Sequence, residues 1–234
     1  MKIWKKIKVF ARTKFAKSSY QIHGVTIPID RKFITDRILY SIIRGRYEGT
    51  EARAVMELVK PEDRVLELGG GVGLISTVAA KIVGDNSVVC VEANPKMIDY
   101  IQKVHKANGI APKIINAVAV GKKITDSVRF YLRKDFWVSS MSPLPDDYIE
   151  VVSVPVAPID DLVNQHNPSV VIIDIEGGEV DLLVGNWADK VRLVIMELHT
   201  EVTGAESMQT IVKFFKDRDF SVEVHDMMLF AKRN

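Results

Sequence analysis

The segment from Val65 to Gly73 constrains the fold of this chain more than any other. Residues 64–68 predict a short buried strand, with Val65, Leu66 and Leu68 as its apolar residues and Glu67 near its end. Residues 74–82 have apolar side chains at helical spacing and are followed by Gly84, so we expect a helix there. A glycine-rich turn joins the two elements. Because glycine has no side chain and a helix N-terminus presents N–H groups, this unit predicts a site where a ligand meets bare backbone.

The spacing of the glycines distinguishes two classes of ligand. A dinucleotide fold usually has the pattern G-x-G-x-x-G, but Leu74 occupies the position of the third glycine. The spacing present is G-x-G-x-G, at Gly69, Gly71 and Gly73, with Glu67 two residues ahead. This pattern resembles the first motif of Rossmann-like S-adenosylmethionine (SAM) methyltransferases. A tight turn that binds no ligand is the alternative.

A second predicted strand, residues 87–92, ends in Glu92 about twenty residues after the glycines. A carboxylate at this point accepts hydrogen bonds from a ribose diol, which NAD and SAM both carry. Glu92 therefore predicts a nucleoside ligand without distinguishing the two, and a salt-bridged surface acid is the alternative. Asn94 and Pro95 have the pattern of an N-cap and first helical residue, so a helix is expected to follow.

Length and composition are those of a soluble globular protein. The chain has 234 residues and a net charge of +2, which is too balanced to indicate nucleic-acid binding. Cys90 is the single cysteine, which excludes an intramolecular disulfide and fits a reducing compartment. No apolar run approaches the roughly 18 residues of a membrane span, and no signal peptide is recognised. We therefore expect a cytoplasmic protein.

Residues 1–19 are basic, lack acidic residues and carry apolar side chains at helical spacing. This pattern predicts a basic amphipathic helix. Such a helix can lie on an anionic membrane, or it can pack on its own domain or on a neighbouring subunit of a homo-oligomer. The sequence leaves these options open. We treat residues 1–49 as an N-terminal extension and residues 50–234 as the main domain.

The extension and the domain differ in their expected elements. In the extension, a hairpin around His23-Gly24 and a helix at 33–43 should precede a helix capped by Thr50. In the domain, strands alternate with helices, which predicts a doubly wound, mostly parallel α/β sheet with a C-terminal antiparallel hairpin. Further helices are expected at 159–163, at 206–218, and after Glu179 as far as residue 183. The further strands expected are 113–117, 128–132, 150–156, 170–174, 192–198, 220–224 and 227–232.

Polar residues end five of the strands expected in this sheet. In sheets of this kind, ligands bind outside the carboxyl ends of the strands, so these side chains should lie at one rim. Asn116 and the following Ala117 lie where an adenine ring would meet a side-chain amide or a backbone N–H, and an ordinary turn asparagine is the alternative. The five strand-end residues are Glu67, Glu92, Asn116, Asp174 and Glu197.

The segment from Ile172 to Glu179 resembles the K-x-D-x-E-G-x-E signature of FkbM-family SAM-dependent methyltransferases. Other family motifs resemble this chain in the same order, and the resemblance covers about residues 45–200. The chain departs from the family pattern at Ile172, where the signature has lysine. Glu67, Gly70 and Gly71 also replace the usual Asp, Ala and Asn. The matching segments are Tyr47-Glu48, Val91–Pro95, Asn116-Ala117 and Glu197–His199.

The resemblance implies a seven-stranded Rossmann-like methyltransferase sheet with one antiparallel strand, and SAM as the cofactor. It also implies O-methylation of a hydroxyl group on a sugar, lipid or natural product. Amino-group methylation of nucleic-acid bases is disfavoured because no N-P-P-Y or D-P-P-Y block is present. The cofactor contacts that follow are Glu67, Gly69, Gly71, Gly73, Glu92, Ala93, Asn116, Ala117 and Asp174.

Methyl transfer to a hydroxyl requires alignment of the two groups and a base that takes the proton. Asp174, Glu176 and His199 follow neighbouring predicted strands, so they are the candidate catalytic residues. Asp174 alternatively holds the amino group of SAM. No dense metal-binding motif is present, so no metal is expected, although these carboxylates and the imidazole are an alternative site for a divalent ion.

The segment Phe136–Pro143 is apolar and carries hydroxyl groups, which predicts a lid or a substrate wall. A small satellite core under the loop is the alternative. Candidate contacts to the acceptor are Tyr47, Glu48, Trp137, Ser139, Ser140 and Glu197.

Two other functions share part of this pattern. A nicotinamide-dependent oxidoreductase would use the same turn and Glu92, but Leu74 and the lack of a Tyr-x-x-x-Lys pair count against it. A non-catalytic, membrane-associated SAM-binding protein would explain residues 1–19. The sequence does not identify the acceptor.

Overall fold

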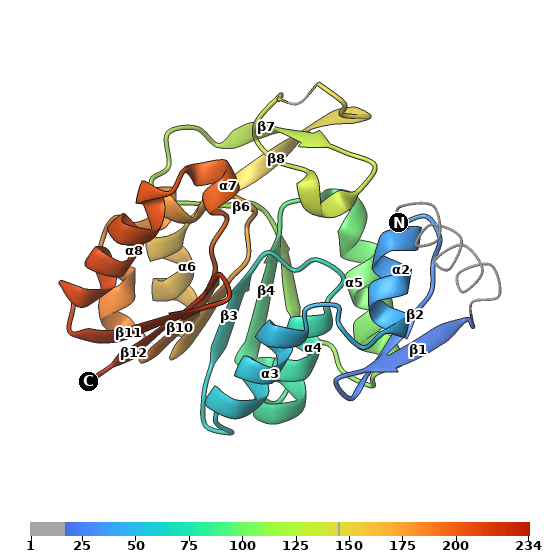
Figure 1. Ribbon diagram of the computed structural model, residues 1–234, viewed down its shortest axis with the longest axis horizontal. Helices are drawn as coiled ribbons and strands as arrows, with labels where there is room; N and C mark the ends of the chain where they lie inside the picture. Colours follow the sequence, from blue (N-terminus) through green and yellow to red (C-terminus); the bar gives the residue numbers. More distant parts are fainter. Residues whose placement is uncertain (1–16, 145) are drawn as a thin grey trace, which may run out of the picture.

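The computed structural model describes residues 17–144 and 146–234, and all but the last three residues of the predicted helix at 1–19 lie outside them. A seven-stranded sheet forms the centre, in the order β11-β12-β10-β9-β3-β4-β5 (Figure 1). β12 is antiparallel to both of its neighbours, and the other pairs are parallel. This confirms the predicted sheet. Its strands are β3 (Val65–Leu68), β4 (Val88–Glu92), β5 (Lys113–Asn116), β9 (Val170–Ile173), β10 (Leu193–Glu197), β11 (Phe220–His225) and β12 (Met228–Arg233).

Helices cover both faces of the sheet because the side chains of each strand alternate between two apolar cores. Val65 lies in the core beneath one group of helices, whereas Leu66 lies in the core beneath the other. The two groups lie on opposite sides of the sheet in Figure 1. The first group is α3 (Gly49–Leu58), α4 (Leu74–Val83) and α5 (Pro95–Ala107), and the second is α6 (Ile159–His166) and α8 (Glu206–Lys216).

The order of the strands places a crevice beside β3. The chain passes from β3 to β4 and β5 on one side and later returns to β9 and β10 on the other side. A reversal of this kind opens a crevice at the carboxyl ends of the two central strands, here β3 and β9.

Asn94 caps the N-terminus of α5 as predicted, and its side chain accepts a hydrogen bond from the backbone N–H of Lys96.

The N-terminal extension packs on the same core as α4 and α5. β1 (Ser19–Ile22) and β2 (Val25–Pro28) form the predicted hairpin, and α2 (Asp36–Ile43) begins three residues later than expected. Side chains of the hairpin and of α2 belong to the apolar cluster that also contains α3, α4 and α5. The boundary at residues 49 and 50 stays a prediction, because the two parts share one core.

Two expectations about local structure are wrong, and one strand was not expected. Thr50 does not cap α3, because the helix begins at Gly49 after Glu48 adopts a left-handed conformation with φ of 46°. The helix expected up to residue 183 is a single 3-10 turn, η3 (Glu179–Leu182), because Gly185 at φ of 67° turns the chain into a second such turn, η4 (Trp187–Lys190). β6 (Val118–Val120) was not anticipated, because it pairs with β8 outside the central sheet.

A second, three-stranded sheet lies above the carboxyl ends of the central strands (Figure 1). It has the order β6-β8-β7, with β7 at Ser127–Leu132 and β8 at Glu150–Pro158. The connection from β7 to β8 includes the 3-10 turn η2 (Phe136–Val138), and the short helix α7 (Thr200–Thr203) follows β10. Within the described residues, none of the helices is long and apolar enough to span a membrane.

Candidate active site

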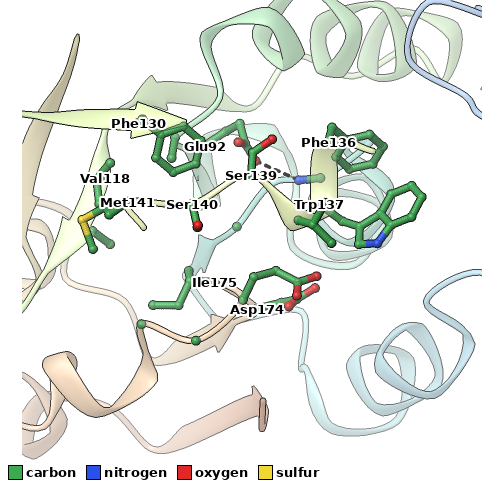
Figure 2. Close-up of a pocket in the computed structure, with 18 of the residues that line it drawn as sticks. Glu92, Val118, Phe130, Phe136, Trp137, Ser139, Ser140, Met141, Asp174 and Ile175 are labelled. Carbon is green, nitrogen blue, oxygen red and sulfur yellow. Dashed lines mark hydrogen bonds between the residues drawn. The ribbon is translucent and has the colours of Figure 1, made fainter. Parts of the chain in front are cut away.

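A cavity of about 530 Å³ lies between the carboxyl ends of the central strands and the second sheet. Its size is that of a small-molecule site. We call the lower side the floor, formed by Gly69, Gly71, residues 92–93 and residues 174–178. The upper side is the roof, formed by β6, β7 and the roof loop, residues 133–144. Figure 2 shows Phe130, Phe136 and Ser140 of the roof facing Asp174 and Ile175 of the floor.

The glycine turn allows β3 and β9 to end close together. Gly69 has a φ of 96°, and a Cβ atom there would lie 1.7 Å from the carbonyl oxygen of Asp174. Gly71 also has a positive φ and lines the cavity. Gly73 precedes α4 and packs against Ile101, so it shapes the turn without lining the cavity. Only glycine fits the first of these positions without displacing the backbone of β9.

Glu67 lies beneath the turn and is not among the residues that line the cavity. Its Oε1 accepts a hydrogen bond from the backbone N–H of Ser76 at 2.9 Å, in the first turn of α4. The Ser76 hydroxyl lies 3.0 Å from His105 Nε2. Burial raises the pKa of Glu67 to about 8. Glu67 thus supports the turn from below, which differs from the expected direct contact with a cofactor.

Glu92 lines the cavity beside the glycine turn. Its Oε2 accepts a hydrogen bond from the backbone N–H of Gly71 at 3.0 Å, drawn as a dashed line in Figure 2, and its Oε1 accepts one from Asn94 at 2.6 Å. Burial raises its pKa to about 7, although the backbone hydrogen bonds oppose this shift. Since each carboxylate oxygen has a further lone pair, Glu92 is positioned to accept bonds from a ligand.

Asn116 holds the end of β4 instead of reaching the cavity. Its Nδ2 donates to the carbonyl oxygens of Glu92 at 2.8 Å and Ala93 at 3.0 Å. Ala93 and Ala117 do line the cavity, next to the roof residue Phe130. The predicted ring-binding region is therefore a small apolar surface with Asn116 behind it.

One end of the cavity is strongly acidic. Glu48, Asp174 and Glu176 all line it, and Tyr47 lies beside them. Burial, with repulsion between neighbouring carboxylates, raises the pKa of Asp174 to about 8 and that of Glu176 to about 7. The pKa of Glu48 is raised to about 8 for the same reasons. Asp174 Oδ1 is buried without a hydrogen-bond partner. Such an end favours a positively charged group of a ligand.

His199 stands behind Glu176 and does not line the cavity. Its Nδ1 lies 2.7 Å from Glu179 Oε1, and its Nε2 lies 3.3 Å from Glu176 Oε2 and 3.7 Å from Asp174 Oδ1. Burial alone would lower the pKa of His199, but Glu179 and the other two carboxylates raise it to about 9. His199 therefore carries a positive charge at neutral pH. Glu179 was not predicted as its partner, although it belongs to the signature segment.

Asp174, Glu197 and His199 form the group in the described residues that could hold a metal ion. One potential ligand atom from each lies within 4.8 Å of the others. Carboxylate and imidazole are donors that divalent cations accept. Glu197, predicted to contact the acceptor, belongs to this group and does not line the cavity.

The roof loop contributes Trp137, Ser139 and Ser140 to the cavity, as the sequence predicted. Arg133 holds this loop, and no sequence pattern had marked it. Its buried guanidinium donates to Asp147 Oδ1 at 2.9 Å, to Val138 O at 3.1 Å and to Ser142 O at 3.1 Å. Arg133 thus links two positions of the roof loop to each other and to Asp147, which follows the loop.

Comparisons with known proteins concern the family of the chain and its fold. The model of the methyltransferase FkbM domain matches residues 68–222, and that of the protein-L-isoaspartate(D-aspartate) O-methyltransferase family matches residues 2–127. A comparison with curated proteins gives no significant match.

Two solved structures show the same fold at low sequence identity. The precorrin-6y C5,15-methyltransferase of Geobacter metallireducens GS-15 is 13% identical with a TM-score of 0.51, over 89% of this chain and 94% of that one. The tRNA m1G37 methyltransferase of M. jannaschii is 15% identical with a TM-score of 0.50, over 92% of this chain and 56% of that one. At such identities the likeness concerns the fold alone.

Proposed function

Because the chain belongs to the FkbM methyltransferase family, we propose that it transfers the methyl group of SAM to a hydroxyl group of a small-molecule acceptor, such as a sugar, lipid or natural product. The observation that carries this proposal is the cavity itself. It joins a glycine turn and Glu92 to an acidic end at Asp174 and Glu176. The glycine turn and Glu92 suit a nucleoside. Asp174 and Glu176 suit a cationic group of the ligand next to a general base.

The residues present fit SAM. Glu92 is positioned to accept hydrogen bonds from a ribose diol, and Ala93, Ala117 and Phe130 offer an apolar surface to a flat ring. The buried Asp174 Oδ1 makes no hydrogen bond, although His199 Nε2 lies 3.7 Å away, and it suits the positively charged end of the cofactor. When bound, SAM supplies a methyl group activated by its positively charged sulfur.

Glu176 is the better of the two candidate bases. It lines the cavity, and its pKa is raised to about 7, so a large fraction is ready to accept a proton at neutral pH. His199, with a pKa raised to about 9, is already protonated there and does not reach the cavity. In this mechanism a carboxylate oxygen of Glu176 takes the hydroxyl proton. His199, held by Glu179, fixes the position of that carboxylate.

The roof loop would contribute to the proposed methyl transfer by orienting the acceptor and by excluding water from the cavity. The roof loop faces Asp174 across the cavity, which Glu176 also lines, so an acceptor under the loop would be held against the cofactor side. Alignment of this kind accounts for much of the barrier lowering in a reaction that joins two molecules.

Formation of S-adenosylhomocysteine from SAM, with a panel of sugars, lipids and other hydroxyl compounds, tests the proposal. Product with at least one hydroxyl acceptor supports it. Calorimetric binding of NAD in place of SAM would instead favour an oxidoreductase. Treatment with EDTA, followed by addition of Mg²⁺, tests the metal alternative at Asp174, Glu197 and His199.

Membrane contact through residues 1–19 is a separate proposal, which rests on their basic amphipathic pattern. Co-sedimentation with anionic liposomes, with and without this segment, tests it. Sedimentation velocity of the same two proteins tests a homo-oligomer formed through the segment.

A further inference from the structure

We propose that the acceptor is an amphipathic molecule whose reacting hydroxyl lies at the acidic end of the cavity and whose apolar chain lies along the roof loop. This inference rests on the proposed methyl transfer and narrows its acceptor. It disfavours a free sugar. Three observations carry it: the lining of the roof, the hydrogen bonds of its serines, and the surface at the entrance.

The side of the cavity formed by the roof is mainly apolar. Figure 2 shows the rings of Phe130, Phe136 and Trp137 and the side chain of Met141 at the cavity. The carboxylates that line the cavity belong to other segments, among them Glu48, Asp174 and Glu176. The cavity thus has a polar end, suited to a hydroxyl group, and an apolar wall, suited to a hydrocarbon chain.

The serines of the roof loop are already engaged in hydrogen bonds within the loop. Ser139 Oγ accepts from the backbone N–H of Arg133 at 2.9 Å. Ser140 Oγ accepts from Arg133 Nη1 at 3.3 Å and from the backbone N–H of Ser142 at 3.3 Å. Ser142 Oγ accepts from the N–H of Leu144 at 3.2 Å.

These hydrogen bonds make the roof better suited to a hydrocarbon chain than to a free sugar. A free sugar has several hydroxyl groups, and each must find a partner when it leaves water. Ser140 has both of its acceptor positions in use, and Ser139 and Ser142 each have one in use, so the serines of this wall offer few free acceptors. A hydrocarbon chain has no such requirement and gains from leaving water.

Exposed apolar surface is concentrated in the roof loop and in the residues that follow it up to Val151. In the described parts of the chain, nine large hydrophobic side chains are exposed, and six of them lie between Val138 and Val151. Val138, Met141 and Leu144 also line the cavity, as does the exposed Val202 of α7. The apolar wall therefore continues from the interior to the surface. Such a continuous strip fits a chain that extends beyond the cavity.

A series of straight-chain primary alcohols from 1-butanol to 1-octanol tests this inference, because each member adds one CH₂ to a constant hydroxyl group. Binding is followed through the fluorescence of Trp137 in the presence of S-adenosylhomocysteine, and a Trp137→Phe variant identifies that signal. We expect the Kd to fall about three- to fourfold for each added CH₂. Glucose and methyl glucoside should bind more weakly than 1-octanol.

Leu144→Asn combined with Val202→Asn should flatten the dependence on chain length. Both side chains are mostly exposed, at 72% and 63%, so the folded protein should tolerate the change. Ile124→Asn is the matched control, because Ile124 is 92% exposed and does not line the cavity. This control should keep the wild-type slope.

The results separate two kinds of failure. If the protein binds SAM but the Kd does not change with chain length, or if glucose binds better than 1-octanol, the amphipathic acceptor is wrong. An unchanged slope in the double variant would also overturn it, since the chain would then lie elsewhere. Absence of SAM binding in calorimetry on the same sample would instead contradict the proposed methyl transfer.

Discussion

The floor of the cavity rests on a seven-stranded sheet with an extensive apolar core on each face, whereas the roof rests on three strands and a small cluster. On the floor, backbone N–H groups hold Glu92, and close strand contact fixes Gly69 beside Asp174. On the roof, Arg133 joins the loop by hydrogen bonds to its carbonyl groups.

This difference assigns separate roles to the two sides. The floor combines the groups proposed for the cofactor and the proton, which all methyl acceptors would require. The roof supplies apolar surface and depends on fewer contacts, so its sequence can change without loss of the floor. We therefore expect changes on the floor to affect chemistry and SAM affinity, and changes on the roof to affect mainly the acceptor.

The largest effect is expected from Glu176→Gln on the floor. Loss of a general base typically lowers turnover by about 10²–10⁴-fold, while SAM affinity should stay near that of the wild type. The base acts when ionised, so wild-type turnover should rise with pH through about 7, where the raised pKa of Glu176 lies. This rise should disappear in the variant.

Glu201→Gln is the matched control for that substitution. Glu201 is an exposed acid near Glu176, and its replacement should leave turnover and the pH profile unchanged. Steady-state kinetics on an identified acceptor give both comparisons. Wild-type turnover in Glu176→Gln would show that proton removal does not depend on this part of the floor.

Gly69→Ala should affect the stability of the floor. The new Cβ would lie 1.7 Å from the carbonyl oxygen of Asp174, in addition to the strain of a φ of 96°. We expect a loss of more than ~3 kcal/mol in the free energy of unfolding, or failure to fold. Gly109→Ala is the control, because Gly109 has a φ of 72° but no atom within 4 Å of a Cβ. It should lose only ~1 kcal/mol, as measured by urea denaturation.

Glu92→Gln should weaken SAM binding by roughly 10- to 100-fold, since hydrogen bonds to a charged acceptor contribute about 1.5–3 kcal/mol. Isothermal titration calorimetry measures the change. Glu57→Gln replaces an exposed acid on α3 and should have no effect. Equal SAM affinity in the wild type and Glu92→Gln would remove Glu92 from the cofactor site.

Arg133→Met should have the smallest effect on chemistry, because it acts on the roof. The loop carbonyls would lose a shared donor, so kcat/KM for the acceptor should fall by about tenfold, or ~1.4 kcal/mol, mainly through KM. Cleavage by trypsin after Lys134 should become faster, and SAM affinity should stay within about twofold. Arg129→Met on the exposed side of β7 is the control. A larger loss of SAM affinity than of acceptor affinity would contradict the division between floor and roof.

The floor was largely predictable from the sequence because its constraints are local. Glycines at fixed spacing, buried strands and acids at strand ends each leave a pattern within a few residues. Asp174, Glu176 and Glu92 were identified in this way, and the structure brings them to one cavity. Glu67 was assigned to the ligand because a short motif does not show whether a side chain points above or below the turn.

The roof was less predictable because its contacts are distant or irregular in sequence. β6 is three residues long and pairs with β8, which begins about thirty residues later, so no periodicity marks it. Arg133 has the pattern of an ordinary charged residue after a strand, and its partners extend to Asp147. The serines of the loop were correctly placed at the cavity, but their hydrogen bonds within the loop depend on a folded shape that the sequence does not reveal.

A crystal structure of the complex with S-adenosylhomocysteine tests the assignment of the cofactor to the floor most directly. We predict that the ribose hydroxyls contact Glu92, that the adenine ring lies between Ala117 and Phe130, and that the amino-acid end points toward Asp174. The ligand should leave the space under Trp137 open for an acceptor. A ligand bound away from Glu92 and the glycine turn, or one that fills the space under the roof loop with its amino-acid end, would contradict the account.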